Sequence, residues 1–177
     1  MGNCLNTIEN NTKNGNKGIY IKANTFVEFH LEEFVGKILE LHNELRKTYN
    51  LPELKLNDYL TALAENYAEK LMSTQNNNSF QPNIYNGVCV GENVVISNSA
   101  NADKIFKYWS EEGLDYDFEK KQFSKGKSHF TQIIWKETTD IGIGFFNDQI
   151  NKKNCTVVLY YPAGNTFGDF PNNVTNK

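Results

Sequence analysis

The 177-residue chain is poor in cysteine and contains no long apolar run, and each scarcity excludes a class of protein. Three cysteines, Cys4, Cys89 and Cys155, are too few for the disulfide framework that staples small secreted domains. A Cys89–Cys155 bond has no supporting pattern, so a reduced, cytosolic environment is the simpler interpretation. No run of about 18 apolar residues exists, which excludes a membrane-spanning helix.

Charge is also weakly biased, because 18 Lys and Arg against 21 Asp and Glu give a net charge of -3. Nucleic-acid-binding domains usually carry a basic stripe, and its absence excludes nucleic acid as a partner. The length suits one domain, and a hydrophobic content of 39% with 13% aromatic residues predicts a globular core.

The first residues are polar throughout and lack the apolar core of a secretory signal peptide. Without a signal peptide, the glycosylation sequons at Asn77 and Asn154 are expected to stay unmodified.

Met1-Gly2-Asn3-Cys4 instead offers two points of acylation. Gly2 is the acceptor of an N-myristoyl group once the initiator methionine is removed, and Cys4 is a candidate for palmitoylation. One myristoyl chain binds a membrane only marginally, whereas two chains anchor a protein stably. Asn6 stands where a small hydroxyl residue is usual, so the alternative is an unmodified, disordered tail.

Composition divides the chain into a flexible tail at 1–24, one domain at 25–171 and a polar end at 172–177. Hydrophobic periodicity predicts helices and strands within the domain. The helices are expected at 29–49, from Asn57 to Leu71, at 98–112 and at 129–135, and the strands at 88–96, 141–145 and 156–161.

Three local features refine this prediction. Asn57 is expected to cap the second helix and Ser128 the short one. Gly91-Glu92-Asn93 is expected to interrupt its strand as a turn. Alternating glycines Gly142 and Gly144 predict a strand packed closely on one face.

Candidate chemistry is limited to few residues, since the chain has three histidines. His30 is interpreted as a surface residue, whereas His42 and His129 lie beside apolar neighbours. Together with Glu92 and Glu112 they could form a metal site, because imidazole and carboxylate ligate zinc. The alternative is that each histidine is a hydrogen-bonded core group. No His-Glu-x-x-His, Cys-x-x-Cys or Gly-x-Ser-x-Gly motif is present.

Five motifs in order resemble the CAP superfamily of cysteine-rich secretory, antigen 5 and pathogenesis-related proteins. They are His-Asn-Glu-Leu-Arg at 42–46, Gly-Glu-Asn at 91–93, Trp-x-x-Glu-x-x-x-Tyr at 109–116, Ser-His-Phe-Thr-Gln-Ile-Ile-Trp-Lys-Glu-Thr at 128–138 and Tyr-Tyr-Pro-Ala-Gly-Asn at 160–165. The match is nearest to the intracellular, Golgi-associated branch, which has a myristoylated Gly2. Ser128 and the lack of a cysteine before Tyr160 depart from the secreted forms.

The resemblance implies an α+β fold, a three-layer α-β-α sandwich of the CAP type, in which His42, Glu92, Glu112 and His129 meet in one cleft. The histidines would bind zinc or another divalent cation, and the glutamates would orient them.

The function expected from the resemblance is a non-enzymatic binding module attached to the cytosolic face of Golgi or endosomal membranes. Its ligands would be a sterol, a phospholipid or a protein, with Phe80, Ile84 and Tyr85 as a lipid-contact loop, and it would form a homodimer. One alternative is a metal-dependent hydrolase with Glu92 or Glu112 as general base. A second alternative is a structural protein whose fold the four residues brace. For the localisation, the alternative is secretion by a route without a signal peptide.

Overall fold

A computed structural model describes residues 17–22, 25–73 and 83–176. The central sheet has the strand order β3-β7-β8-β6. Its strands are β3 (Lys55–Leu56), β6 (Gly91–Ser97), β7 (Asp140–Asp148) and β8 (Lys153–Tyr161). β8 pairs antiparallel with β6 and β7, and β3 adds parallel to β7.

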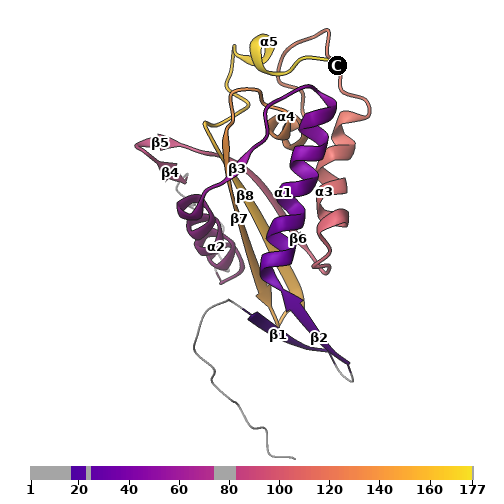
Figure 1. The fold of residues 1–177 in the computed structure, drawn as a ribbon, viewed down its shortest axis with the longest axis vertical. Coiled ribbons are helices and arrows are strands. Elements are labelled where there is room, and N and C mark those ends of the chain that lie inside the picture. The colour runs from indigo at the N-terminus through magenta and orange to yellow at the C-terminus, as the bar shows by residue number, and fades with distance from the viewer. Residues whose placement is uncertain (1–16, 23–24, 74–82, 177) are drawn as a thin grey trace, which may run out of the picture.

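Helices cover both faces of this sheet, as Figure 1 shows. Helix α2 (Asp58–Ser73) packs on one face, while α1 (Leu31–Thr48), α3 (Ala102–Ser110) and α4 (Ser128–Ile133) lie on the other. The 3-10 turn η1 (Glu111–Gly113) follows α3 directly. The three-layer α-β-α architecture predicted from the resemblance is therefore confirmed.

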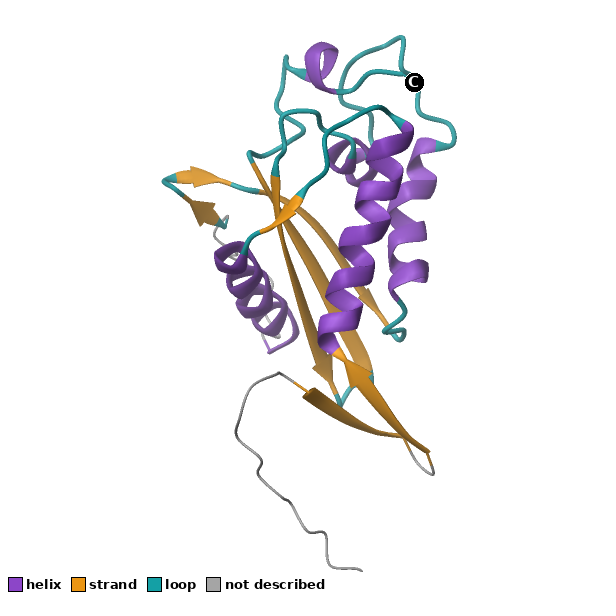
Figure 2. Ribbon diagram, in the orientation of Figure 1, coloured by secondary structure: helices purple, strands orange, loops and turns teal. Residues whose placement is uncertain are grey.

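Smaller elements complete the chain (Figure 2). Strands β1 (Lys17–Lys22) and β2 (Thr25–His30) pair as an antiparallel hairpin, as do β4 (Ile84–Tyr85) and β5 (Val88–Cys89). Helix α5 is Phe170–Asn173. The domain boundary expected at residue 25 falls inside the first hairpin, and the expected polar end contributes buried Asn173 and Val174.

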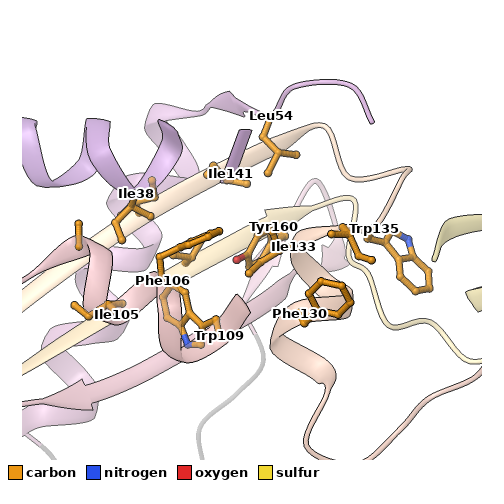
Figure 3. Packing of buried hydrophobic residues seen from close by; sticks show 14 of the residues in the cluster. Ile38, Leu54, Ile105, Phe106, Trp109, Phe130, Ile133, Trp135, Ile141 and Tyr160 are labelled. Carbon is orange, nitrogen blue, oxygen red and sulfur yellow. The ribbon is translucent and has the colours of Figure 1, made fainter. Parts of the chain in front are cut away.

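Two apolar clusters lie on the two faces of the sheet, because successive residues of β8 point to opposite sides. Val158 and Tyr160 face the larger cluster under α1, α3 and α4, part of which Figure 3 shows. Val157 and Leu159 face the smaller cluster under α2. The prediction that this strand is buried on both faces is confirmed.

Close packing of α2 on β7 depends on two glycines. A Cβ atom at Gly142 would lie 2.0 Å from the backbone of Leu60, and one at Gly144 would lie 2.2 Å from that of Ala64. Side chains would push the helix off the sheet, so the prediction of a closely packed glycine face is confirmed. Asn57 also caps α2 as predicted, since its Oδ1 accepts from two backbone N–H groups of the first turn.

Two local predictions are wrong. Gly91, Glu92 and Asn93 form the first half of β6 and not a turn, because all three pair with β8. The residue that precedes α4 is Lys127, so Ser128 is its first helical residue and not its cap.

Candidate functional site

Glu112 and His129 form the one pair in direct contact among the predicted site residues that the structure describes. Glu112 sits in η1, at the end of α3, and His129 lies in the first turn of α4. Its Oε1 is 2.6 Å from His129 Nδ1, and its Oε2 accepts hydrogen bonds from the backbone N–H groups of His129 and Phe130 at 2.9 and 3.2 Å. Glu112 therefore caps α4 and fixes the imidazole with the same carboxylate.

The imidazole of His129 lies at the surface between two rings of α3. Its centroid is 6.0 Å from that of Tyr108 and 6.3 Å from that of Trp109, and the side chain is 26% exposed. Within the described part of the chain, Nε2 makes no hydrogen bond. Glu112 holds the ring by its other nitrogen, Nδ1, so Nε2 has a fixed direction and is open to a ligand.

His42 occupies the opposite environment, buried beneath α3. Its Nδ1 is 2.7 Å from the Ile38 carbonyl oxygen, to which it donates, and Nε2 accepts from the Tyr160 hydroxyl at 2.8 Å. Burial lowers the pKa of His42 from its usual 6.5 to about 4. Both ring nitrogens of His42 are thus bonded inside the core, which disfavours His42 as a metal ligand.

Trp109 separates the two histidines. Its ring centroid lies 6.4 Å from that of His42 and 6.3 Å from that of His129. Figure 3 shows Trp109 and Phe106 packed beside the Tyr160 hydroxyl that His42 engages. The indole forms a wall between the core histidine and the surface histidine.

Glu92 lies on the other face of the sheet. It stands opposite Leu159, which belongs to the cluster under α2, whereas its neighbour Asn93 bonds to Tyr160 and to the His129 carbonyl. Although Glu92 is exposed at the sheet edge, desolvation raises the pKa of its carboxyl group, and hydrogen bonds from Asn83 and Tyr67 oppose the shift. Glu92 therefore does not join the Glu112–His129 pair.

These placements do not fit the expected zinc site. A catalytic zinc usually has three protein ligands. Among the residues that the structure describes, no three His, Cys, Asp or Glu side chains are arranged to hold a metal. Glu112 has both oxygens engaged and His42 both nitrogens, so the described part of the predicted site offers His129 Nε2 alone.

Arg46, which the sequence reasoning did not single out as functional, connects α1 to the end of α4 and to the segment that follows it. It is fully buried and donates four hydrogen bonds of 2.7 to 3.1 Å to the carbonyl oxygens of Pro52, Ile133, Trp135 and Thr138. Burial lowers its pKa to about 10. Its signal was its place in the His-Asn-Glu-Leu-Arg motif, one helical turn after His42.

Gln132 joins the two C-terminal motifs. Its Oε1 accepts from the Gly164 N–H at 2.9 Å, and its Nε2 lies 3.3 Å from Thr138 Oγ1. A Cβ atom at Gly91 would lie 2.0 Å from the same Oε1. Asn165 adds a bond to the Ser128 carbonyl at 2.9 Å, so α4 and the 162–165 loop are fixed together.

Of the remaining predicted site residues, the structure describes Ile84 and Tyr85. Phe80, Gly2 and Cys4 lie outside the described residues. Ile84 is 53% exposed on the β4–β5 hairpin, while Tyr85 packs edge-on against Tyr161 at a centroid distance of 4.9 Å. No helix in the described ranges combines the length and apolarity needed to cross a bilayer.

The model of the cysteine-rich secretory protein family (CAP) matches residues 39–161, and the chain belongs to this family.

Individual relatives support the assignment. The chain is 33% identical over 146 residues to the human Golgi-associated plant pathogenesis-related protein 1, covering 81% of this chain and 93% of that protein. It is 27% identical over 138 residues to pathogenesis-related protein 1A of Nicotiana tabacum, covering 75% and 77%. The crystal structure of NaASP2 with Zn2+ is similar with a TM-score of 0.62 and 25% identity, covering 77% and 83%.

Proposed function

We propose that this protein is a membrane-attached, non-enzymatic binding module that takes a lipid, sterol or protein ligand at the face carrying His129. The observation that carries this proposal is the burial of His42. It leaves His129 as the one imidazole of the pair able to reach a ligand, and a single oriented imidazole suits a binding contact better than a metal-dependent reaction. The exposed Ile84 is a separate apolar point on the β4–β5 hairpin, which lies on the α2 side of the sheet.

Membrane attachment would come from acyl chains at Gly2 and Cys4, and the Golgi association of the human relative favours the cytosolic face of Golgi or endosomal membranes. A hydrolase that uses Glu112 and His129 as an oriented general base is the second candidate, because a carboxylate bonded to Nδ1 is how such bases are held. Replacing His129 would abolish turnover in that case and leave membrane attachment unchanged.

The attachment is tested by vesicle flotation of the full chain made in cells that acylate proteins. We expect wild type to float, Gly2→Ala to stay in solution, and Cys4→Ser to bind weakly, since one myristoyl chain gives an association constant of only about 10⁴ M⁻¹. Asn10→Ala is the matched control. Flotation of Gly2→Ala at the wild-type level, with no acyl mass on the purified protein, would refute the anchor.

In this proposal, His129 is the histidine through which a divalent cation would bind. In a calorimetric zinc titration we expect His129→Ala to abolish any binding that wild type shows and His42→Gln to leave it unchanged, because His42 has no free nitrogen. Loss of binding in a folded His42→Gln variant would restore the two-histidine site. Circular dichroism of both variants checks that the fold is kept.

A further inference from the structure

The two edges of the central sheet are unlike each other. β3 forms one edge with only two residues, Lys55 and Leu56, both exposed. β6 forms the other edge with seven residues, Gly91–Ser97, and among the described strands it pairs with β8 alone. Short edges that carry lysine are protected from further pairing, whereas long ones are not.

The residues of β6 also favour pairing. Val94, Val95 and Ile96 are consecutive β-branched residues, and Ile96 is 48% exposed. The strand contains no lysine, arginine or proline, and Glu92 is its one charged residue. Residues of this kind on an unprotected edge form a template for another strand.

A groove of about 460 Å³ runs between β6 and α3. Val95 and the buried Ile105 contribute apolar lining, and Tyr108, 59% exposed, forms a wall toward His129. Lys104 also lines the groove, and it forms no ion pair with any residue in the described ranges. The volume is in the range of side-chain and ligand pockets.

The spacing along α3 matches the spacing along a strand. Lys104 and Tyr108 are four residues apart, which is about 6 Å of helix. Alternate residues of an extended chain point the same way and are about 6.8 Å apart. Because Ser97 leads through a short loop into α3, while Asn93 bonds to His129 near the end of α3, the helix runs antiparallel to β6. Lys104 therefore lies toward Ser97 and Tyr108 toward Asn93.

We propose that β6 binds an extended segment of a partner protein by antiparallel strand addition, with two alternate side chains of that segment in the β6–α3 groove. The charge of Lys104 and the apolar surface at Ile105 and Tyr108 define those side chains as an acidic residue followed, two positions later, by an apolar one. Main-chain hydrogen bonds supply affinity in this mode and the groove supplies the sequence preference.

The probe is an acetylated, amidated heptapeptide, Thr-Thr-Glu-Thr-Val-Thr-Thr, titrated to about 1 mM into the ¹⁵N-labelled full chain. We expect saturable shifts of the β6 and α3 amide signals. Lys104→Glu should weaken binding about fivefold or more, because it replaces an attraction by a repulsion. Lys107→Glu is the matched control on the same helix and should stay within about twofold, since Lys107 pairs with Glu111 and does not line the groove.

Two further peptides, N-methylated at the odd or at the even positions, test the strand pairing itself. In a paired strand the N–H groups of alternate residues point toward the neighbouring strand. The peptide methylated at the positions that face β6 should therefore not bind, and the peptide methylated at the other positions should bind. Equal behaviour of the two, equal effects of the two lysine changes, or no shifts at β6 would overturn the proposal. So would sedimentation showing that β6 pairs with a second copy of the chain, with Ile96→Lys making it monomeric.

Discussion

His42 and His129 carry the same side chain in opposite surroundings. The Ile38 carbonyl fixes the proton of His42 on Nδ1, and the Tyr160 hydroxyl then donates to Nε2. Protonation of Nε2 would force Tyr160 to turn and would place a charge beside Phe106 in the core. His129 is partly exposed instead, and its Nδ1 bonds to the Glu112 carboxylate.

The buried His42 predicts a loss of stability in mild acid. Its pKa is about 4 in the folded chain and about 6.5 when unfolded, so the unfolded state binds more protons as pH falls from 6.5 to 4. The contribution of neutral His42 to the free energy of unfolding is fully present above pH 6.5. It decreases by up to about 3 kcal/mol as the pH falls to 4. Urea unfolding at several pH values checks this.

His42→Gln serves as the reference in that experiment, because an amide keeps a donor and an acceptor without titrating in this range. Subtracting its pH dependence removes the contribution of surface carboxylates. Equal pH dependence in wild type and His42→Gln would contradict a neutral, buried imidazole.

Sequence reasoning placed His42 correctly at the edge of a buried helix face and could not identify its partner. Tyr160 is 118 positions away along the chain, and no periodicity predicts which hydroxyl meets which ring nitrogen. The contact between Glu112 and His129 agrees with the resemblance, which places both in one cleft with His42 and Glu92, whereas the pattern of residues alone predicts no such contact. The resemblance also places Glu92 in this cleft, but its position in β6 opposite Leu159 directs it to the α2 face of the sheet.

At the scale of elements, glycines determine how closely the layers approach. Gly91 suggested a turn in the sequence, but it is required inside a strand because Gln132 fills the space of its Cβ atom. Sequence periodicity gave α1 and α2 to within about two residues of their ends, since their apolar faces are long. A glycine that is required because another segment packs against it gives no such signal in the local sequence.

Two Gly→Ala substitutions should therefore have opposite effects. Gly144→Ala places a methyl group 2.2 Å from the backbone of Ala64 in α2, so we expect a loss of about 2 kcal/mol in unfolding free energy. Gly36→Ala, in the middle of α1 with nothing within 4 Å of its Cβ position, should gain about 0.5–1 kcal/mol. Chemical denaturation of both measures this, and a shared sign would contradict the packing described for α2.

Across the whole molecule, the C-terminal segment packs against residues 135–137, which follow α4. Asn173 accepts from the Glu137 N–H at 2.9 Å and donates to the Asp169 carbonyl at 3.2 Å, and Val174 beside it is fully buried. Composition suggested a polar end here because asparagines usually lie in exposed turns. What overrides composition is that Asn173 provides hydrogen-bond partners for the backbone N–H groups of residues 136 and 137.

Neighbouring asparagines provide a matched test. Asn173→Ala removes both side-chain bonds and leaves the Glu137 N–H unpaired, so we expect a loss of about 2 kcal/mol. Asn172→Ala, at an exposed position of the same helix, should change stability by no more than about 0.5 kcal/mol. Thermal unfolding compares the two, and an unaffected Asn173→Ala would show that the end of the chain is not part of the folded unit.

The indole of Trp109, held between two imidazoles, gives the protein an intrinsic optical reporter. A protonated imidazole beside an indole quenches its fluorescence, and here each neighbour lies about as close as the other. Burial keeps His42 neutral near neutral pH, and hydrogen bonds hold its ring in place, so a change in emission when a ligand binds at the surface reports on the His129 side of the indole. The other tryptophan, Trp135, packs on Phe170. Occupancy of His129 by a ligand can thus be followed by light emission, without a label.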